Sequence, residues 1–482
     1  MHFSLTNGYA VLKQCNDDEY DWISDYLTFE YPTFFRGKRG VTKKKLFNPM
    51  NGSFPAGLLR VVRSTALEEQ GFTVTVEDDR VKPCDPDPNA DLGWLRPYQL
   101  EAVERAVKRT KGILWLPTGA GKTEIAIGLV KKVPTKWLFI VHRSQLAEQA
   151  AARYNLRTGK TASTVNEDGD WEGDSTFNVA TFQTLWRYHK TDKFRKFMDS
   201  VGGIIIDEAH TLPADSFWQV AMAARNAYWR IGLSGTPLAR SDHKSTLTVA
   251  ALGLPMYRVR PAELIKLGVI AKPDIRFIHV PQPEEPHVNR RWAQVYKRYI
   301  SNSKVRNSKV VDATAVAQKP ALVFVSQLKH GRDLLALMHK KGMNAGMVDG
   351  AKSTELRNKR IQQLVEGDID VLICTVVFQE GVDIPDLRSV VVACGGASDI
   401  ATIQRIGRGM RMAAGKSNFE VWDFMDYGHN WVTKHSRSRA RAYIDEGFDV
   451  FEGNTISGEF TLHQQRRRRK KLSKLEKLTD FE

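Results

Sequence analysis

The chain has 482 residues, of which 42% are hydrophobic and 26% charged, a composition typical of a globular protein with several domains. No apolar run approaches the ~18 residues that a membrane-spanning helix needs, so we expect no membrane partner. The net charge of +16 favours a polyanionic partner, of which nucleic acid is the most common, although a basic balance can also serve solubility alone. Four scattered cysteines without a CxxC pair predict reduced thiols and no structural metal.

Residues 1–90 are expected to form a small α+β domain that binds nucleic acid. Strand-like runs at 9–12, 59–62 and 72–76 alternate with helix-like ones. Basic residues stand among aromatic ones at 34–39 and 43–47, which suits a groove that follows a phosphate backbone while rings stack on bases. An ordinary solvated face explains this pattern equally well. The start of the chain lacks the basic and apolar segments of a secretory signal, which predicts a cytoplasmic protein.

Two α/β lobes follow a linker that is rich in proline and aspartate, at 82–90. Buried-looking strands alternate with helical patterns, which is typical of a parallel sheet with crossover helices. The strands of the first lobe, 91–256, are expected at 137–141, 177–181, 203–207 and 230–234, and those of the second, 257–445, at 321–325, 371–375 and 389–393. The remaining residues, 446–482, are expected to form a basic tail, and the like charges at 466–471 should keep that run unfolded until it meets an anion.

A glycine-rich loop between a predicted strand and a predicted helix indicates a nucleotide-phosphate site. Its glycines let backbone N–H groups turn toward phosphate oxygens, Lys122 supplies a positive charge, and the Thr123 hydroxyl can ligate Mg²⁺. The strict pattern has glycine where this chain has Leu116, and a turn that binds nothing is the alternative interpretation. The loop consists of Pro117, Thr118, Gly119, Ala120, Gly121, Lys122 and Thr123.

An acidic pair follows the apolar run 204–206. The carboxyl ends of parallel strands gather at one edge of a sheet, so Asp207 can share a Mg²⁺ with Thr123 while Glu208 orients or deprotonates the attacking water. An acidic pair at a strand end can otherwise serve only as a helix cap. In the second lobe, Arg408 and Arg411 are three residues apart and share a helix face, so they can stabilise charge on the transferred phosphate.

Taken in order, these and other stretches resemble the motifs of superfamily 2 helicases from Trp94 to Asp426. The resemblance implies two tandem RecA-like lobes that use ATP and Mg²⁺, and this family commonly lacks glycine at the position of Leu116. The matching stretches are 95–99, 116–123, 141–146, 179–185, 207–210, 233–237, 323–327, 375–385 and 404–411.

The resemblance also implies a role for each matching residue. The catalytic residues are Lys122, Asp207 and Glu208, together with the arginine fingers Arg408 and Arg411 and the neighbouring Gln404. The metal is held by Thr123 and Asp207. The adenine faces Arg96 and Gln99, and Gly381 and Asp383 lie at the ribose side of the nucleotide. Coupling of hydrolysis to movement falls to His210, Ser234 and Thr236. Contacts to one nucleic-acid strand are implied for Arg143, Thr181, Gln183, Ser326, Gln327 and Thr375.

Residues 207–210, which we call the acidic box, have the sequence Asp-Glu-Ala-His that is typical of one RNA helicase group. Gly235 and the short stretch after Arg411 differ from that group. Residues 263–270 instead resemble XPB-like and phage UvsW-like DNA helicases, and residues 20–29 and 54–59 resemble UvsW-type proteins. The latter resemblance implies an enzyme that migrates junctions and reverses forks in branched DNA, in the host cytoplasm if a phage encodes it. We expect this enzyme to act as a monomer. Absence of a nuclease, methyltransferase or zinc signature disfavours a restriction-enzyme subunit. An RNA-dependent ATPase or strand-annealing protein, and a non-motor protein with a degenerate nucleotide site, are the alternatives.

Overall fold

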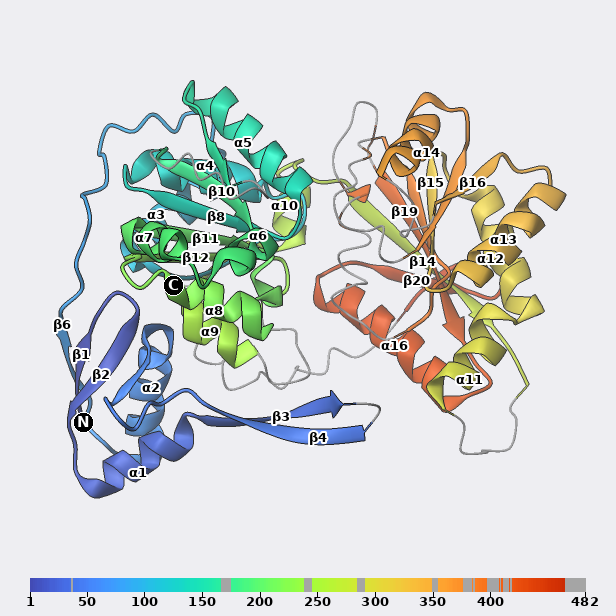
Figure 1. The fold of residues 1–482 in the computed structure, drawn as a ribbon. Helices are drawn as coiled ribbons and strands as arrows, with labels where there is room; N and C mark the ends of the chain where they lie inside the picture. Colours follow the sequence, from blue (N-terminus) through green and yellow to red (C-terminus); the bar gives the residue numbers. More distant parts are fainter. Residues whose placement is uncertain are drawn as a thin grey trace. The chain divides into compact units, whose positions relative to one another are not determined.

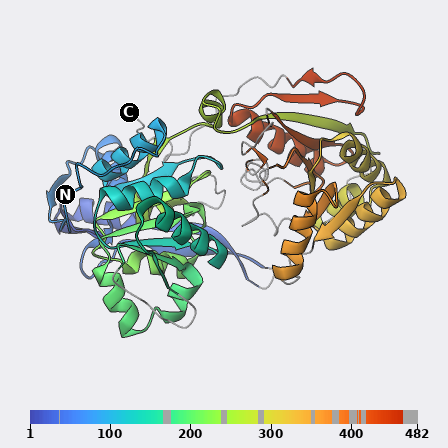
Figure 2. The same cartoon turned by 90° about the horizontal axis from the view of Figure 1, so that it is seen from above.

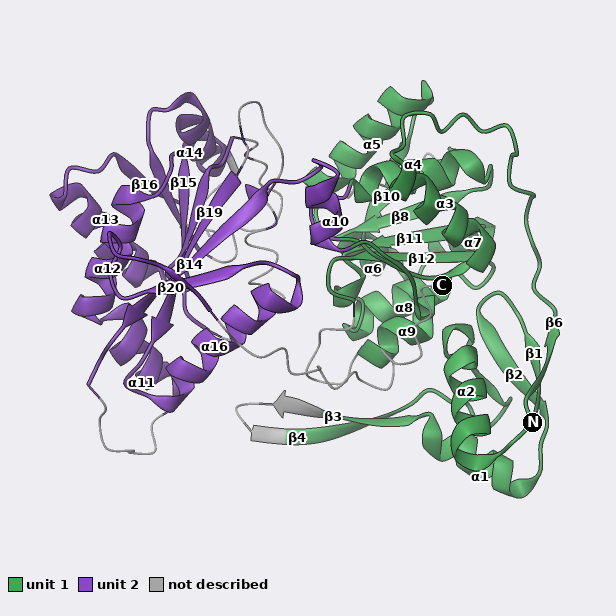
Figure 3. Ribbon diagram, turned by 180° about the vertical axis from the view of Figure 1, so that it is seen from behind, with its two compact units in different colours: residues 1–116, 121–259, 469–482 green, residues 117–120, 260–468 purple. Residues whose placement is uncertain are grey.

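The structure is a computed structural model. It describes residues 1–35, 38–165, 175–237, 245–283, 291–348, 354–375, 384, 386–396, 407, 409–410, 416 and 418–463. These residues divide into two compact units, with the boundary between Val259 and Arg260, and residues 117–120 of the glycine-rich loop group with the second unit (Figure 3). No helix within these ranges is long and apolar enough to cross a membrane.

The chain begins with a small four-stranded sheet in the order β5-β2-β1-β6, which two helices accompany. A long hairpin, β3–β4, leaves this sheet as a two-stranded arm (Figures 1 and 2). The elements are β1 (His2–Leu5), β2 (Tyr9–Gln14), α1 (Asp17–Tyr26), β3 (Thr28–Phe35), β4 (Lys38–Lys45), β5 (Ser53–Pro55), α2 (Leu59–Gln70) and β6 (Thr75–Asp78).

The strand expected at 59–62 is wrong, because these residues form the first turn of α2. Leu59, Val62 and Ala66 are buried at helical spacing, so the apolar face continues past the four residues on which the strand was predicted. A window of four apolar residues does not distinguish a buried helix from a strand.

The first lobe contains a seven-stranded sheet in the order β13-β7-β12-β11-β8-β10-β9, and every neighbouring pair is parallel. The predicted parallel sheet is therefore confirmed here. Its strands are β7 (Lys111–Trp115), β8 (Trp137–Val141), β9 (Ser163–Val165), β10 (Phe177–Thr181), β11 (Gly203–Asp207), β12 (Trp229–Ser234) and β13 (Pro255–Arg258).

Helices cover both faces of this sheet because its buried strands alternate their side chains between two apolar layers. Ile204 and Ile206 pack toward α6 to α9, whereas Phe139 and Phe177 lie on the other face, where Tyr154 of α5 packs on Phe177. The helices are α3 (Pro97–Arg109), α4 (Lys122–Lys132), α5 (Ser144–Thr158), α6 (Phe182–Tyr188), α7 (Asp192–Ser200), α8 (Asp215–Ala223) and α9 (Ser245–Leu252).

The N-terminal sheet shares a hydrophobic core with the first lobe inside unit 1. Phe3, Phe54 and Val62 pack in one cluster with Leu247 and Leu254. The close approach needs glycine, because a Cβ on Gly57 would lie 2.1 Å from the Val249 carbonyl oxygen. The N-terminal part is thus docked on α9.

The second unit holds an eight-stranded sheet in the order β16-β17-β15-β18-β19-β14-β20-β21, parallel except for the last pair. This second parallel sheet confirms the other predicted lobe. Its strands are β14 (Lys272–Val280), β15 (Ala321–Val325), β16 (Ala345–Val348), β17 (Val371–Thr375), β18 (Ser389–Val392), β19 (Asn418–Asp426), β20 (Val450–Gly453) and β21 (Thr461–Leu462). The helices of this unit are α10 (Pro261–Lys266), α11 (Trp292–Tyr296), α12 (Lys304–Val316), α13 (Leu328–Lys340), α14 (Thr354–Glu366) and α16 (Asn430–Asp445).

Candidate nucleotide and nucleic-acid site

The parallel sheet of the first lobe places the predicted site residues at the ends of its strands. The glycine-rich loop follows β7, Asp207 ends β11 and Ser234 ends β12. Arg143 and Thr181 follow or end the neighbouring strands β8 and β10. All of these strands run in one direction, so their carboxyl ends form a single edge, where ligands of open parallel sheets bind.

The glycine-rich loop has the backbone conformation that a phosphate cradle requires. Gly119 and Gly121 have φ of 87° and 77°, in the left-handed region that favours glycine, and Gly121 caps the N-terminus of α4. A Cβ on Gly121 would lie 2.4 Å from Nε2 of Gln99. Leu116 is fully buried and its N–H donates to the Ser234 carbonyl oxygen at 2.9 Å. Leu116, where the strict pattern has glycine, is therefore part of the buried core beside β7 and β12.

The lysine of the loop meets the acidic box directly. Lys122 Nζ lies 2.7 Å from Oε1 of Glu208, and the φ of Glu208 is 47°, a left-handed value that is rare for a side chain of this size. Burial opposes ionisation of Glu208, but the charges of Lys122 and His210 hold its pKa well below the usual range. Burial and the neighbouring Glu208 charge raise the pKa of Asp207 to about 6. The two carboxyl groups therefore have different proton affinities.

The carboxylates retain oxygens that fit a magnesium ion. Oδ1 of Asp207 is buried and has no hydrogen-bond partner among the described residues, and Oε2 of Glu208 is buried with only the His210 ring beside it, at 3.3 Å. A buried carboxylate oxygen without a partner is costly, and carboxylate and hydroxyl oxygens are the ligands that Mg²⁺ takes beside nucleotide phosphates. Asp207 would hold the ion, with Thr123 supplying a hydroxyl from the first turn of α4. The bound ion would neutralise phosphate charge.

Gln99 and Arg96, the predicted adenine contacts, form the N-terminus of α3. Gln99 is 2% exposed, and its Oε1 accepts a hydrogen bond from the Arg96 backbone N–H at 2.9 Å. Since Gln99 also approaches Gly121, the amide lies against the phosphate loop. This contact brings the α3 N-terminus beside the cradle.

The predicted coupling residues form a hydrogen-bonded group around the acidic box. His210 Nδ1 lies 3.3 Å from Oε2 of Glu208 and 3.2 Å from Oγ of Ser234. The Thr236 backbone N–H donates to the same Ser234 oxygen at 3.1 Å. Ser234 is fully buried, so its hydroxyl connects β12 to the acidic box by a direct hydrogen bond that is shielded from solvent.

A second link from the acidic box was not predicted from the sequence. The Thr211 hydroxyl donates to the Glu208 carbonyl oxygen at 2.8 Å and is also hydrogen-bonded to Nε2 of His142. The His142 carbonyl oxygen in turn accepts from Nε2 of Gln183 at 3.1 Å, and its ring meets Phe182 edge-on, 5.3 Å between centroids. His142 and Gln183 lie in stretches that resemble motifs contacting a nucleic-acid strand. Their positions in the sequence give no sign that either is linked to Thr211.

The other residues of the first lobe that are predicted to contact nucleic acid lie at the N-termini of helices. Arg143 is the N-cap residue of α5, and Thr181 is the N-cap residue of α6. Oγ1 of Thr181 accepts from the Thr184 backbone N–H at 3.1 Å. Both residues therefore stand where backbone N–H groups point outward, a favourable place for phosphate.

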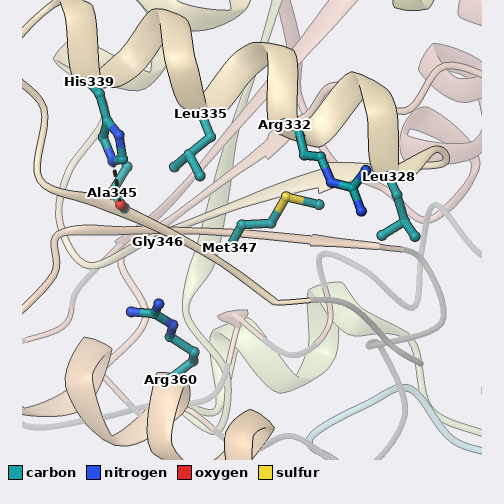
Figure 4. Close-up of a pocket in the computed structure, with 8 residues that line it drawn as sticks. All are labelled: Leu328, Arg332, Leu335, His339, Ala345, Gly346, Met347 and Arg360. Carbon is teal, nitrogen blue, oxygen red and sulfur yellow. Dashed lines mark hydrogen bonds between the residues drawn. The ribbon is translucent and has the colours of Figure 1, made fainter. Parts of the chain in front are cut away.

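In the second unit, the residues predicted to contact nucleic acid lie at the ends of β15 and β17. Ser326 and Gln327 are exposed just before α13, and Ser326 Oγ donates to the Cys394 carbonyl oxygen at 3.3 Å. Thr375 ends β17 and is 8% exposed. Directly after Gln327, a hollow of about 270 Å³ opens between α13, β16 and α14 (Figure 4). The hollow is lined by Leu328, Arg332, Leu335, His339, Ala345, Gly346, Met347 and Arg360.

Five predicted residues lie outside the described residues, so the structure places none of their side chains. They are the two arginine fingers, the glutamine beside them and the two ribose-side residues: Arg408, Arg411, Gln404, Gly381 and Asp383.

A buried charge network holds the turn that precedes the arginine segment. Arg306 donates to Oδ1 of Asp426 and to the carbonyl oxygen of Ala393, both at 2.8 Å. Arg439 forms an ion pair with Asp423 and donates to the Gly396 carbonyl oxygen at 2.7 Å. Both arginines are 1% exposed or less, so these bonds are shielded from solvent. Sequence reasoning missed this network because its members lie far apart in the chain.

Comparisons with known proteins agree with this geometry. Residues 93–239 match the family described as type III restriction enzyme, res subunit, and residues 306–413 match the helicase conserved C-terminal domain. Helicase 22 of Sulfolobus islandicus filamentous virus is 26% identical over 397 residues, covering 77% of this chain and 69% of that protein. The ATP-dependent DNA helicase uvsW of Enterobacteria phage T4 is 26% identical over 387 residues, covering 73% of this chain and 75% of that protein.

Among solved structures, the ATP-dependent type ISP restriction-modification enzyme LlaBIII bound to DNA shares the fold. Its TM-score is 0.54 at 15% identity, over 80% of this chain and 32% of that chain. The phosphate loop, the acidic box and the two matched family domains lead to one assignment: the chain belongs to the superfamily 2 helicases, similar to the UvsW type, which hydrolyse ATP with Mg²⁺.

Proposed function

We propose that this ATP-dependent DNA helicase remodels branched DNA by moving along one strand as it hydrolyses ATP. Branch migration, fork reversal and unwinding are the reactions that follow from such movement at a junction. The proposal places the enzyme in recombination, repair or the restart of replication.

One observation carries the coupling of hydrolysis to movement. An unbroken series of hydrogen bonds joins the acidic box to the predicted strand-contacting segments, through Thr211, His142 and Gln183. The series starts at Glu208, whose carboxylate is paired with Lys122 of the phosphate loop. A change at the nucleotide phosphates can therefore alter the position of Glu208, and with it the two segments that contain Arg143 and Thr181.

The proposed catalytic roles follow from chemistry. Lys122 neutralises β- and γ-phosphate charge, and Glu208, kept ionised, accepts hydrogen bonds from the attacking water. Arg408 and Arg411 are assigned to the charge that develops on the transferred phosphate, a role worth about 10³–10⁵ in rate. Their arrival and release define closed and open states of the two lobes, and each cycle advances the enzyme along the strand.

Two features support branched DNA as the substrate. The similarity to the phage T4 DNA helicase uvsW covers three quarters of that protein, and the N-terminal part carries a basic hairpin, β3–β4, with Lys43 exposed and Lys44 held by Asp215 at 2.7 Å. We assign 1–90 to duplex binding and 91–256 to the first motor lobe. The second motor lobe extends from 257 to 463, past the predicted boundary at 445, because β20 and β21 belong to its sheet. The basic residues at 466–471, which lie outside the described residues, are proposed to add affinity for DNA. The enzyme is proposed to act as a monomer.

The test compares four substrates side by side: a mobile four-way junction, a replication fork, a simple overhang duplex and an RNA duplex. The proposal predicts ATP-dependent conversion of the junction and the fork at rates well above that of the overhang, with Lys122→Ala inactive on all of them. Exclusive processing of the RNA duplex would instead establish an RNA helicase. Annealing that needs no ATP would establish a strand-annealing protein.

A further inference from the structure

We propose that the exposed face of α16 is a second binding surface, which holds single-stranded DNA through its phosphates and one stacked base. The inference rests on the proposed function, since it takes DNA as the polyanion, and it adds a site outside the helicase motifs. Four residues form this α16 face: Trp431, Lys434, Arg437 and Arg441.

The α16 face is a continuous cationic stripe. Lys434, Arg437 and Arg441 are exposed and spaced three and four residues apart, so they lie within one side of the helix. At 1.5 Å per residue the three charges span about 10.5 Å along the axis. Each of the three cations can meet one phosphate of a single strand, so the stripe offers three phosphate contacts.

The charges of the stripe are not neutralised. Across the ranges that the structure describes, Lys434, Arg437 and Arg441 make neither an ion pair nor a hydrogen bond through their side chains. The one acid in α16 is Asp445, at its last position. Other exposed helices differ: α7, for example, carries Asp192 and Asp199 beside its basic residues. An unbalanced stripe attracts an anion, whereas a mixed surface serves solubility.

An aromatic pair, of which Trp431 is exposed and Trp292 half-buried, extends the stripe at the N-terminal end of α16. Trp431 is 41% exposed, a high value for a large apolar side chain, and its ring centroid lies 6.3 Å from that of Trp292. Trp292 packs against His435 with 4.4 Å between ring centroids, which fixes the pair on the helix. An indole beside phosphate-binding cations is the arrangement on which an unpaired base stacks.

The buried face of α16 holds the stripe in place. Val432, Ser436, Arg439 and Tyr443 recur at helical spacing and are buried. Arg439 pairs with Asp423 of β19, and its Nη2 lies 2.8 Å from Oδ1. The helix lies at the surface of the second unit, with its labelled ribbon outside the sheet strands (Figures 1 and 3). Ligand binding there needs no reordering of the helix.

The experiment measures binding of the full chain to oligo(dT) across a salt series. Replacing Lys434, Arg437 and Arg441 with alanine should reduce the slope of log affinity against log salt by about 2, at roughly 0.7 per lost phosphate contact. The matched control replaces Lys193, Arg195 and Lys196 of α7 with alanine, which removes the same charge and should leave the slope unchanged. Circular dichroism and thermal unfolding establish that both variants are folded.

A further variant tests stacking. Trp431→Ala should weaken oligo(dT) binding roughly 5- to 150-fold with the slope preserved, and Trp431→Phe should restore part of the affinity. Equal slopes for the α16 and α7 variants overturn the inference, as does a loss of affinity confined to duplex DNA. Wild-type ATPase activity that DNA does not stimulate would instead refute the proposed function, so the two failures are distinguishable.

Discussion

Replacement of Glu208 by glutamine tests the division of labour inside the acidic box. Glutamine keeps the size of the side chain but loses the charge that lies 2.7 Å from Lys122 Nζ. The glutamine oxygen can still accept a hydrogen bond from the water but cannot take its proton, and a general base of the proposed kind contributes about 10²–10⁴ in rate, or about 2.7–5.4 kcal/mol. We therefore expect kcat to fall by that factor.

Nucleotide binding should respond in the opposite direction. The Glu208 charge is one cause of the raised pKa of Asp207, so its removal makes Asp207 a better magnesium ligand, and Lys122 is released toward the phosphates. The dissociation constant of ATP with Mg²⁺ should stay unchanged or fall. Steady-state hydrolysis in the presence of DNA and equilibrium nucleotide binding measure the two effects, with the exposed Glu148→Gln as the control. A kcat within about threefold of the wild-type value would refute the assigned role.

Three further predictions concern coupling, packing and pH. Thr211→Val removes the hydroxyl that joins the acidic box to His142, and the ratio of DNA-stimulated to unstimulated ATPase rate should fall by about tenfold, whereas an unchanged ratio would exclude this link. Gly57→Ala places a Cβ 2.1 Å from a carbonyl oxygen of α9 and should reduce the free energy of unfolding by about 1–3 kcal/mol in urea denaturation; no loss would contradict the packing described. Burial, with the nearby charge of Arg306, lowers the pKa of His330 to about 3, so the unfolded chain binds a proton below pH ~6.5 and the folded chain does not. Stability present above pH 6.5 is therefore lost toward pH 3, by about 2 kcal/mol at pH 5, and His330→Leu should flatten this part of a pH series of unfolding free energies.

The parallel sheets were predictable because their strands carry their own signal. Residues 203–207 and 371–375 are short runs of β-branched and apolar residues, and both form fully paired central strands. The phosphate loop and the acidic box were predictable for a chemical reason, since phosphate binding demands glycine and lysine at fixed spacing. The strand predicted at 59–62 failed because burial against α9 decided the local structure.

The long-range contacts of the site could not be predicted. Arg306 and Asp426 are 120 residues apart, and neither is unusual in its own segment. The bond between Thr211 and His142 likewise exists only because β8 and β11 are neighbours in the sheet. Strand order therefore determines these pairings, and a single sequence does not encode it in local spacing.

The rate of ATP hydrolysis with and without a four-way DNA junction tests the central claim most directly. Because the acidic box is hydrogen-bonded to the segments that we predict to contact the DNA strand, we expect the junction to raise the rate at least about tenfold, more than RNA of equal length does. Hydrolysis that proceeds at the same rate with the junction, with RNA and without nucleic acid would contradict the claim that this chain couples ATP hydrolysis to movement on branched DNA.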